Sequence, residues 1–177
     1  MVENGKGSGS STITGKVFEK EVDIVSFLLK NEKCVSKKGK YNTENIITID
    51  DKVVARTMIS HDLYKFLKDD YKISSEEIIS KKLLPDGLIV NYMNNTIYII
   101  EKKFQKVAGS VDEKLQTCAF KKRQYIKLFS STGFNVEYVY VLNDWFKADQ
   151  YNDTLSYIRE VGCHYFFYDI PREFLGC

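Results

Sequence analysis

Two strand-like runs joined by a pair of asparagines give the clearest structural signal in the sequence. Residues 87–93 and 96–102 are rich in β-branched and aromatic side chains, which favour extended strands. Asn94 and Asn95 between them tolerate the positive φ of a tight turn. The pattern predicts an antiparallel hairpin with a two-residue turn.

The register of that hairpin determines which polar side chains share a face. A two-residue turn places Asp86 opposite Lys103 and Glu101 opposite Leu88, so Glu101 is diagonal to Asp86. Because directly paired residues project on one side, Asp86, Glu101 and Lys103 are predicted to share a face. A four-residue loop gives the same result, whereas a three-residue loop turns Asp86 away. Lys102 points to the opposite side in every case.

Hydrophobic periodicity predicts further helices and strands on both sides of the hairpin. Ser60 and Ser110 are expected N-caps, and Glu113 would complete a capping box with Ser110. The order of elements predicts an α/β fold, with helices flanking both faces of a central sheet. The sheet is expected to be mixed, as in α+β proteins. Helices are expected at 16–30, 60–69, from 74, 110–129 and 149–161, and strands at 46–50, 53–58, 136–142 and 163–170.

The 177 residues, of which 44% are hydrophobic, suffice for one sizeable core but not for two ordinary domains. Residues 1–15 are rich in Gly and Ser and are expected to be flexible, ahead of a single domain over 16–177. Residues 51–84 are a candidate substrate-recognition insertion. No apolar run reaches the roughly 20 residues of a membrane span, so a soluble, cytoplasmic protein is expected.

Two familiar site patterns are excluded. Residues 9–16 (GSSTITGK) resemble a phosphate-binding P-loop, but the glycine spacing is too long and Val17 stands where Ser or Thr should bind magnesium. No nucleotide cofactor is therefore expected. The cysteines and histidines show no zinc-binding spacing, and free or buried thiols are expected. These residues are Cys34, Cys118, Cys163, Cys177, His61 and His164.

The net charge of +2 does not by itself indicate a nucleic-acid binder, but basic residues are dense between positions 102 and 127. On a helix after the hairpin they could contact several phosphates. The same residues equally suit a solvated helix surface. The candidates for contact with nucleic acid are Lys106, Lys114, Lys121, Gln124 and Lys127.

The shared face of the hairpin offers oxygen ligands for a hard cation. The carboxylates of Asp86 and Glu101 and the backbone carbonyl of Lys102 suit Mg²⁺ or Mn²⁺, which can activate water toward a phosphodiester. Lys103 would orient that water or help to deprotonate it. The alternative is that Asp86 is a turn residue after Pro85 and that the Glu101–Lys103 triplet is incidental in a highly charged chain.

These residues resemble the motif of the PD-(D/E)XK nucleases, a superfamily that includes many type II restriction endonucleases. Pro85-Asp86 is followed, after residues 87–100, by Glu101-Lys102-Lys103 on the second arm of a hairpin. Residues 15–19 (GKVFE) open the first helix as in many members, and a basic helix follows the hairpin. Gln124 and Tyr125 resemble positions that support the site. The resemblance covers residues 15–142.

The resemblance implies a restriction-endonuclease-like core in which Asp86, Glu101 and Glu19 hold Mg²⁺ and Lys103 positions the attacking water. Mn²⁺ could replace Mg²⁺. The implied function is sequence-specific cleavage of double-stranded DNA by a homodimer, because the usual targets are two-fold symmetric. Two alternatives are a structure-selective nuclease, acting on Holliday junctions or in repair, and a non-catalytic nucleic-acid-binding module with the same fold.

Overall fold

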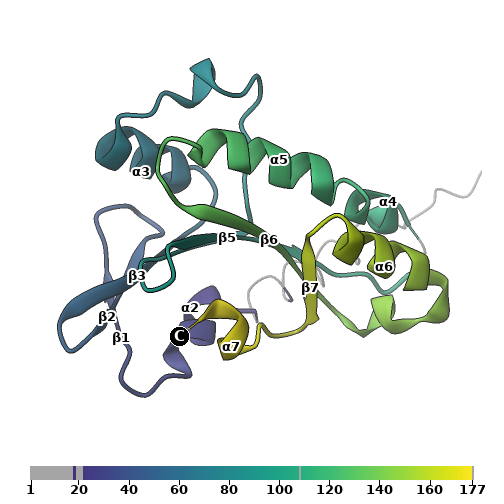
Figure 1. The fold of residues 1–177 in the computed structure, drawn as a ribbon. Helices are drawn as coiled ribbons and strands as arrows, with labels where there is room; N and C mark the ends of the chain where they lie inside the picture. The colour runs from purple at the N-terminus through teal and green to yellow at the C-terminus, as the bar shows by residue number, and fades with distance from the viewer. Residues whose placement is uncertain (1–17, 19–21, 108, 177) are drawn as a thin grey trace, which may run out of the picture.

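The computed structural model describes residues 18, 22–107 and 109–176. The described residues form a seven-stranded sheet in which spatial order follows sequence order (Figure 1). Strands β1 to β5 pair antiparallel, and β5, β6 and β7 pair parallel. The strands are β1 (Val35–Lys38), β2 (Asn45–Ile49), β3 (Lys52–Met58), β4 (Gly87–Asn91), β5 (Thr96–Lys103), β6 (Asn135–Leu142) and β7 (His164–Phe167).

Helices cover both faces of the sheet. Figure 1 shows α3, α4, α5 and α6 on one face and α2 and α7 on the other. The predicted mixed α/β fold is therefore confirmed. The α-helices are α2 (Ile24–Leu29), α3 (Asp62–Tyr71), α4 (Val111–Leu115), α5 (Cys118–Phe129), α6 (Asn152–Glu160) and α7 (Arg172–Leu175), and the short 3₁₀ helices are η1 (Ser75–Glu77), η2 (Asp144–Lys147) and η3 (Asp149–Tyr151).

The central strand β5 is buried on both sides because it supplies apolar side chains to two cores. Ile97 and Ile99 pack into the larger core, beneath α3, α5 and α6. Tyr98 and Ile100 alternate with them and pack into the smaller core against α2 and α7. None of the helices described is long and apolar enough to cross a membrane.

The β4–β5 hairpin forms as predicted, but its loop has four residues instead of two. Asn91 pairs with Thr96, which leaves 92–95 as the loop. The side-chain Oδ1 of Asn91 accepts a hydrogen bond of 2.8 Å from the backbone N–H of Met93, and Asn95 has a φ of +54°. The local bond from Asn91 ends the strand two residues earlier than the apolar pattern suggests.

The longer loop displaces the register without changing the faces. The last recorded pair at the open end is Gly87 with Ile100, so Asp86 lies beside Glu101. Every predicted pair, including Asp86 with Lys103, is therefore displaced by two residues. A displacement of two preserves the alternation of side chains, and Asp86 and Glu101 remain on the same face.

Several predicted helix starts are wrong. Ser60 has a φ of +52° and lies outside α3, which begins at Asp62 without a side-chain cap. Ser110 makes no capping hydrogen bond, so the expected capping box does not form. The helix predicted at 110–129 is two helices, α4 and α5, interrupted at 116–117. Within the first predicted helix, 16–30, the described residues show Phe18 as helical, a break at 22–23, and α2 from Ile24 to Leu29.

Gly87 allows α2 to pack closely against β4. A Cβ added there would lie 1.8 Å from Cδ1 of Ile24 and 3.5 Å from Cβ of Ile100. We predict that Gly87→Ala lowers the free energy of unfolding by about 1–3 kcal/mol, because the added methyl group overpacks this contact. Urea denaturation measures the change. In the Ile24→Ala background the same substitution should cost less.

Gly109→Ala is the matched control for Gly87→Ala, because the nearest atoms to its Cβ would be 3.9 Å away. This variant should change the free energy of unfolding by no more than about 0.5 kcal/mol. Equal losses at the two glycines would contradict the packing explanation.

Candidate active site

The open end of the β4–β5 hairpin brings three of the predicted catalytic side chains together. The ammonium Nζ of Lys103 lies 2.8 Å from Oε2 of Glu101 and 3.4 Å from Oδ2 of Asp86. The side chain of Glu101 is 8% exposed and that of Asp86 is 29% exposed, so the cluster is buried on one side and open at Asp86. The geometry confirms the shared face expected for Asp86, Glu101 and Lys103.

Backbone hydrogen bonds fix the position of Asp86. The N–H of Lys102 donates to Oδ2 of Asp86 at 2.8 Å, which ties the carboxylate to β5. The carbonyl of Pro85 accepts a hydrogen bond of 3.0 Å from the N–H of Ser60, at the corner between β3 and α3. Asp86 is thus held by β5 on one side and by the corner between β3 and α3 on the other, although it precedes β4.

A second lysine enters the site from α5. Nζ of Lys121 lies 3.5 Å from Oε1 of Glu101, and its side chain is 25% exposed. Its position among basic residues of the helix after the hairpin had suggested that Lys121 faces away from the apolar stripe, whereas the side chain turns toward Glu101. Its spacing shows why: Lys121 lies three residues after Cys118 and four before Tyr125, and both of these are buried. The position of Lys121 on the same helical face as these two buried residues is the signal that indicates its inward orientation.

The charges at the site balance each other. Burial alone lowers the pKa of Lys103, but the attraction of Glu101 and Asp86 outweighs it, and the pKa is raised above its ordinary value. Lys103 is therefore positively charged at neutral pH. Two carboxylates thus face the two ammonium groups of Lys103 and Lys121.

Tyrosines form the buried wall beside Glu101. Tyr140 pairs in register with Glu101 on the neighbouring strand β6. Burial raises the pKa of Tyr125 and of Tyr138, and the negative charge of Glu101 raises both further. These hydroxyls remain neutral, and the low polarity of the wall strengthens the charge interactions of the site.

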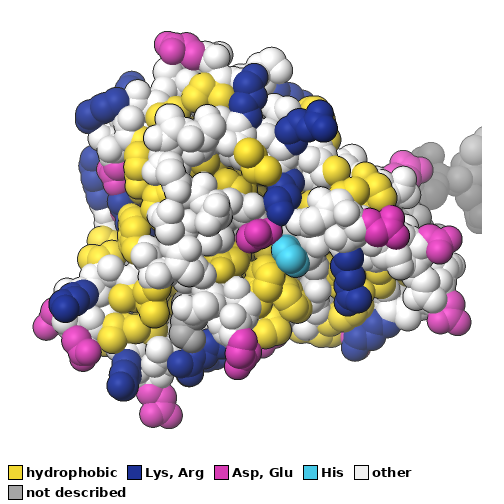
Figure 2. All heavy atoms as spheres, in the orientation of Figure 1, with side chains coloured by type: hydrophobic (Ala, Val, Ile, Leu, Met, Phe, Trp, Pro, Cys, Tyr) yellow, Lys and Arg dark blue, Asp and Glu magenta, His cyan; other side chains and the backbone are white. Residues whose placement is uncertain are grey.

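The other predicted contact residues do not join this cluster. Lys106, Lys114 and Lys127 are exposed, and Gln124 is half-buried. Figure 2 shows Lys and Arg side chains over α3 and α5, in the upper part of the view, and not one continuous basic patch. Glu19, the additional carboxylate suggested by the resemblance, lies outside the described residues.

Residues 51–84, the candidate recognition insertion, form β3, α3, η1 and the segment that leads to Asp86. Arg56 pairs with Glu44 and Asp70, and its guanidinium lies over the ring of Phe66. Arg56 therefore links β3 to α3 inside the fold and is not placed to contact a substrate.

Gln105, two residues after the end of β5, is a buried polar residue that the sequence did not single out. It follows Glu101 and Lys103 at alternate positions, and its N–H donates to Oδ1 of Asn143 at 3.1 Å. Both polar atoms of its side chain are buried, and they have no hydrogen-bond partner among the described residues. An unpaired buried carboxamide costs free energy unless a water or a ligand satisfies it.

The donor set fits a magnesium or manganese ion. Among the described residues no group of three His, Cys, Asp or Glu side chains could hold a metal. Mg²⁺, however, commonly uses one or two carboxylates and keeps several waters. Asp86 and Glu101 supply two carboxylates, and the carbonyl of Lys102 faces the same cluster, 3.2 Å from Nζ of Lys103. These hard oxygen donors match that preference.

The comparisons with known proteins identify one family. The family model described as PD-(D/E)XK nuclease superfamily domain matches residues 10–161, which include the hairpin and α5. No curated protein and no solved structure gives a significant match. The match covers most of the chain.

Two neighbouring tyrosines give a test of the wall beside Glu101. The hydroxyl of Tyr125 has no hydrogen-bond partner among the described residues, whereas that of Tyr140 donates to the carbonyls of Lys114 and Leu115. We predict that Tyr140→Phe lowers the free energy of unfolding by about 0.5–1.5 kcal/mol and that Tyr125→Phe is neutral or stabilising. Chemical denaturation measures both. A larger loss in Tyr125→Phe would refute this assignment.

Proposed function

Because this chain belongs to the PD-(D/E)XK nuclease superfamily, we propose that it hydrolyses phosphodiester bonds of DNA at Asp86, Glu101 and Lys103. One observation carries the proposal: the ammonium group of Lys103 lies within 3.4 Å of both carboxylates. The partial exposure of Asp86 leaves this cluster accessible to a polymeric substrate.

We propose that Asp86, Glu101 and the carbonyl of Lys102 hold Mg²⁺, with Mn²⁺ as a substitute. Glu19 is proposed as a further ligand from its position in the sequence. When bound, the ion supplies Lewis-acid activation of water and neutralises charge on the phosphate. The protein supplies the oxygen donors and the buried wall that fix where this happens.

Lys103 acts as a cation and hydrogen-bond donor in this proposal. With its proton on Nζ, it would orient the attacking water and stabilise charge on the phosphate oxygens. The other role expected from the sequence is that Lys103 helps to deprotonate that water. Lys121, on the far side of Glu101, adds a second positive charge for the phosphate.

The proposed substrate is double-stranded DNA, cut at specific sequences by a homodimer of restriction type. A divalent ion would leave two lysines and two carboxylates with a local charge of about +2, which attracts a phosphodiester. Lys106, Lys114, Gln124 and Lys127 are proposed to contact flanking phosphates. Cleavage of branched DNA in preference to a plasmid would instead indicate a structure-selective nuclease, and binding without cleavage would indicate a non-catalytic module.

The direct test is cleavage of plasmid DNA with Mg²⁺ by the wild type and by Asp86→Ala and Lys103→Ala. We expect each variant to lose at least about 100-fold in kcat, because each removes a charge that acts in the transition state. Asp153→Asn and Lys52→Met are matched controls: both residues are exposed, Asp153 on α6 and Lys52 at the opposite end of β3. Wild-type rates in both alanine variants would refute the site.

Binding of the ion can be measured without catalysis. We predict that Mg²⁺ or Mn²⁺ raises the Tm of the wild type. At a concentration 100 times its Kd, the ion stabilises the folded state by about 2.7 kcal/mol. The gain should be much smaller in Asp86→Asn and Glu101→Gln, because each variant loses a charged ligand. Asp153→Asn should retain the full shift. Equal shifts in all four proteins would place the ion elsewhere.

A further inference from the structure

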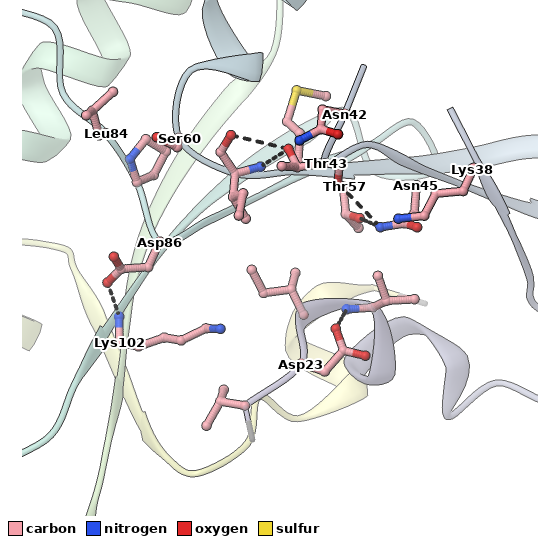
Figure 3. Close-up of a pocket in the computed structure, with 16 residues that line it drawn as sticks. Asp23, Lys38, Asn42, Thr43, Asn45, Thr57, Ser60, Leu84, Asp86 and Lys102 are labelled. Atoms are coloured by element: carbon pink, nitrogen blue, oxygen red, sulfur yellow. Dashed lines mark hydrogen bonds between the residues drawn. The ribbon is translucent and has the colours of Figure 1, made fainter. Parts of the chain in front are cut away.

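A cavity opens beside Asp86 on the α2 face of the sheet. The cavity has a volume of about 710 Å³, within the range of ligand sites, and lies between α2 and the ends of β1, β2 and β3. Figure 3 shows Asp86 and Lys102 at one end and Asn42, Asn45 and Lys38 at the other. Val22, Ile24 and Met58 contribute apolar parts of its lining.

A row of polar side chains crosses the sheet inside this cavity. Lys38 pairs in register with Asn45, and Asn45 pairs with Thr57, so the three project on the same face. Farther along the same face, Ile47 and Ala55 are fully buried in the smaller core. The polar row therefore replaces apolar packing only at the strand ends, inside the cavity that Asp86 borders at its other end.

The amides in the cavity retain hydrogen-bonding capacity. Nδ2 of Asn45 makes only long contacts, 3.4 Å to Oγ1 of Thr57 and 3.5 Å to the carbonyl of Thr43. Within the described residues, Oδ1 of Asn45 has no donor, and the exposed side chain of Asn42 has no hydrogen-bond partner. Each amide can offer both a donor and an acceptor to a ligand.

The wall that carries Asn42 is held in place. The buried carboxylate of Asp62 accepts hydrogen bonds from the N–H of Thr43 at 2.8 Å and from its hydroxyl at 2.7 Å. Burial alone raises the pKa of Asp62, but Lys65 and Thr43 outweigh it, and the pKa is lowered. The charged carboxylate thus fixes the β1–β2 loop to α3, and a ligand meets preorganised amides.

The described part of the lining is electrically balanced. Its described charged residues are Lys38 and Lys102 against Asp23 and Asp86. The carboxylate of Asp23 accepts from the N–H of Val25 and caps α2. A channel for phosphates would require an excess of positive charge, whereas neutral amides and hydroxyls match the edges of nucleobases.

We propose that this cavity binds the edges of nucleobases next to the phosphate cleaved at Asp86, and so determines sequence preference. The inference rests on the proposed nuclease function. Asn45 and Asn42 make the main base contacts, with Thr57 and Ser60 beside them. Asp86 and Lys102 border both the cavity and the catalytic cluster, which places a bound base close to the scissile phosphate.

The test compares cleavage profiles on a library of duplex DNA with randomised sequence. Wild type, Asn45→Ala, Asn45→Asp and Asn42→Ala are incubated with Mg²⁺, and the cut ends are sequenced. Asn152→Ala is the matched control, because Asn152 is an exposed asparagine on α6. Urea denaturation of each variant checks that the fold is retained.

We expect the wild type to prefer particular bases near the cut. Asn45→Ala should reduce the ratio of kcat/KM between preferred and other sequences by about 10- to 100-fold, the range for loss of a bidentate base contact. Asn45→Asp should change the preferred base, because a donor becomes an acceptor. A purely structural asparagine would not change base identity. Asn42→Ala, in an exposed loop, provides a second test of base preference if Asn45→Ala fails to fold.

The outcomes separate the inference from the function on which it rests. If the wild type cuts no DNA with Mg²⁺ or Mn²⁺, the proposed function fails and the inference fails with it. If it cuts without base preference, or if the cavity variants keep the wild-type profile, only the base-binding inference is overturned. A change in profile in Asn152→Ala would also overturn it.

Discussion

The antiparallel pairing of β4 with β5 is the constraint from which the site follows. Because side chains alternate along both strands, this pairing alone decides that Asp86, Glu101 and Lys103 share one face and that Lys102 takes the other. The parallel pairing of β5 with β6 then requires a crossover connection. That connection carries α5, which brings Lys121 to the same carboxylate.

The charge balance of the cluster explains how a buried carboxylate is tolerated. Glu101 is almost fully buried, and leaving it unpaired would be strongly unfavourable. Lys103 and Lys121 contact its two oxygens, and Asp86 contacts Lys103. These four side chains thus form a complete ion-pair network, and a cation would compete with the lysines for the same oxygens.

Alternation and helical spacing make part of this structure predictable from sequence, and local hydrogen bonds make part of it unpredictable. The shared face was predictable because a register shift of two residues leaves each side chain on the same face of the sheet. The loop length was not predictable, because it depends on one hydrogen bond that the side chain of Asn91 accepts. The inward orientation of Lys121 was predictable because it lies on the helical face of the buried residues Cys118 and Tyr125. The strand β1 (Val35–Lys38) was not, because its residues are mostly exposed and pairing with β2, not apolar periodicity, forms it.

The peptide of Lys102 joins the two faces of the sheet. Its N–H holds the carboxylate of Asp86, its carbonyl meets the ammonium group of Lys103, and its side chain enters the opposite cavity. A small rotation of this one unit would alter both compartments at once. In the proposed function, a cation on one side and a base on the other would both meet this one peptide unit, so the position of each would bear on the other.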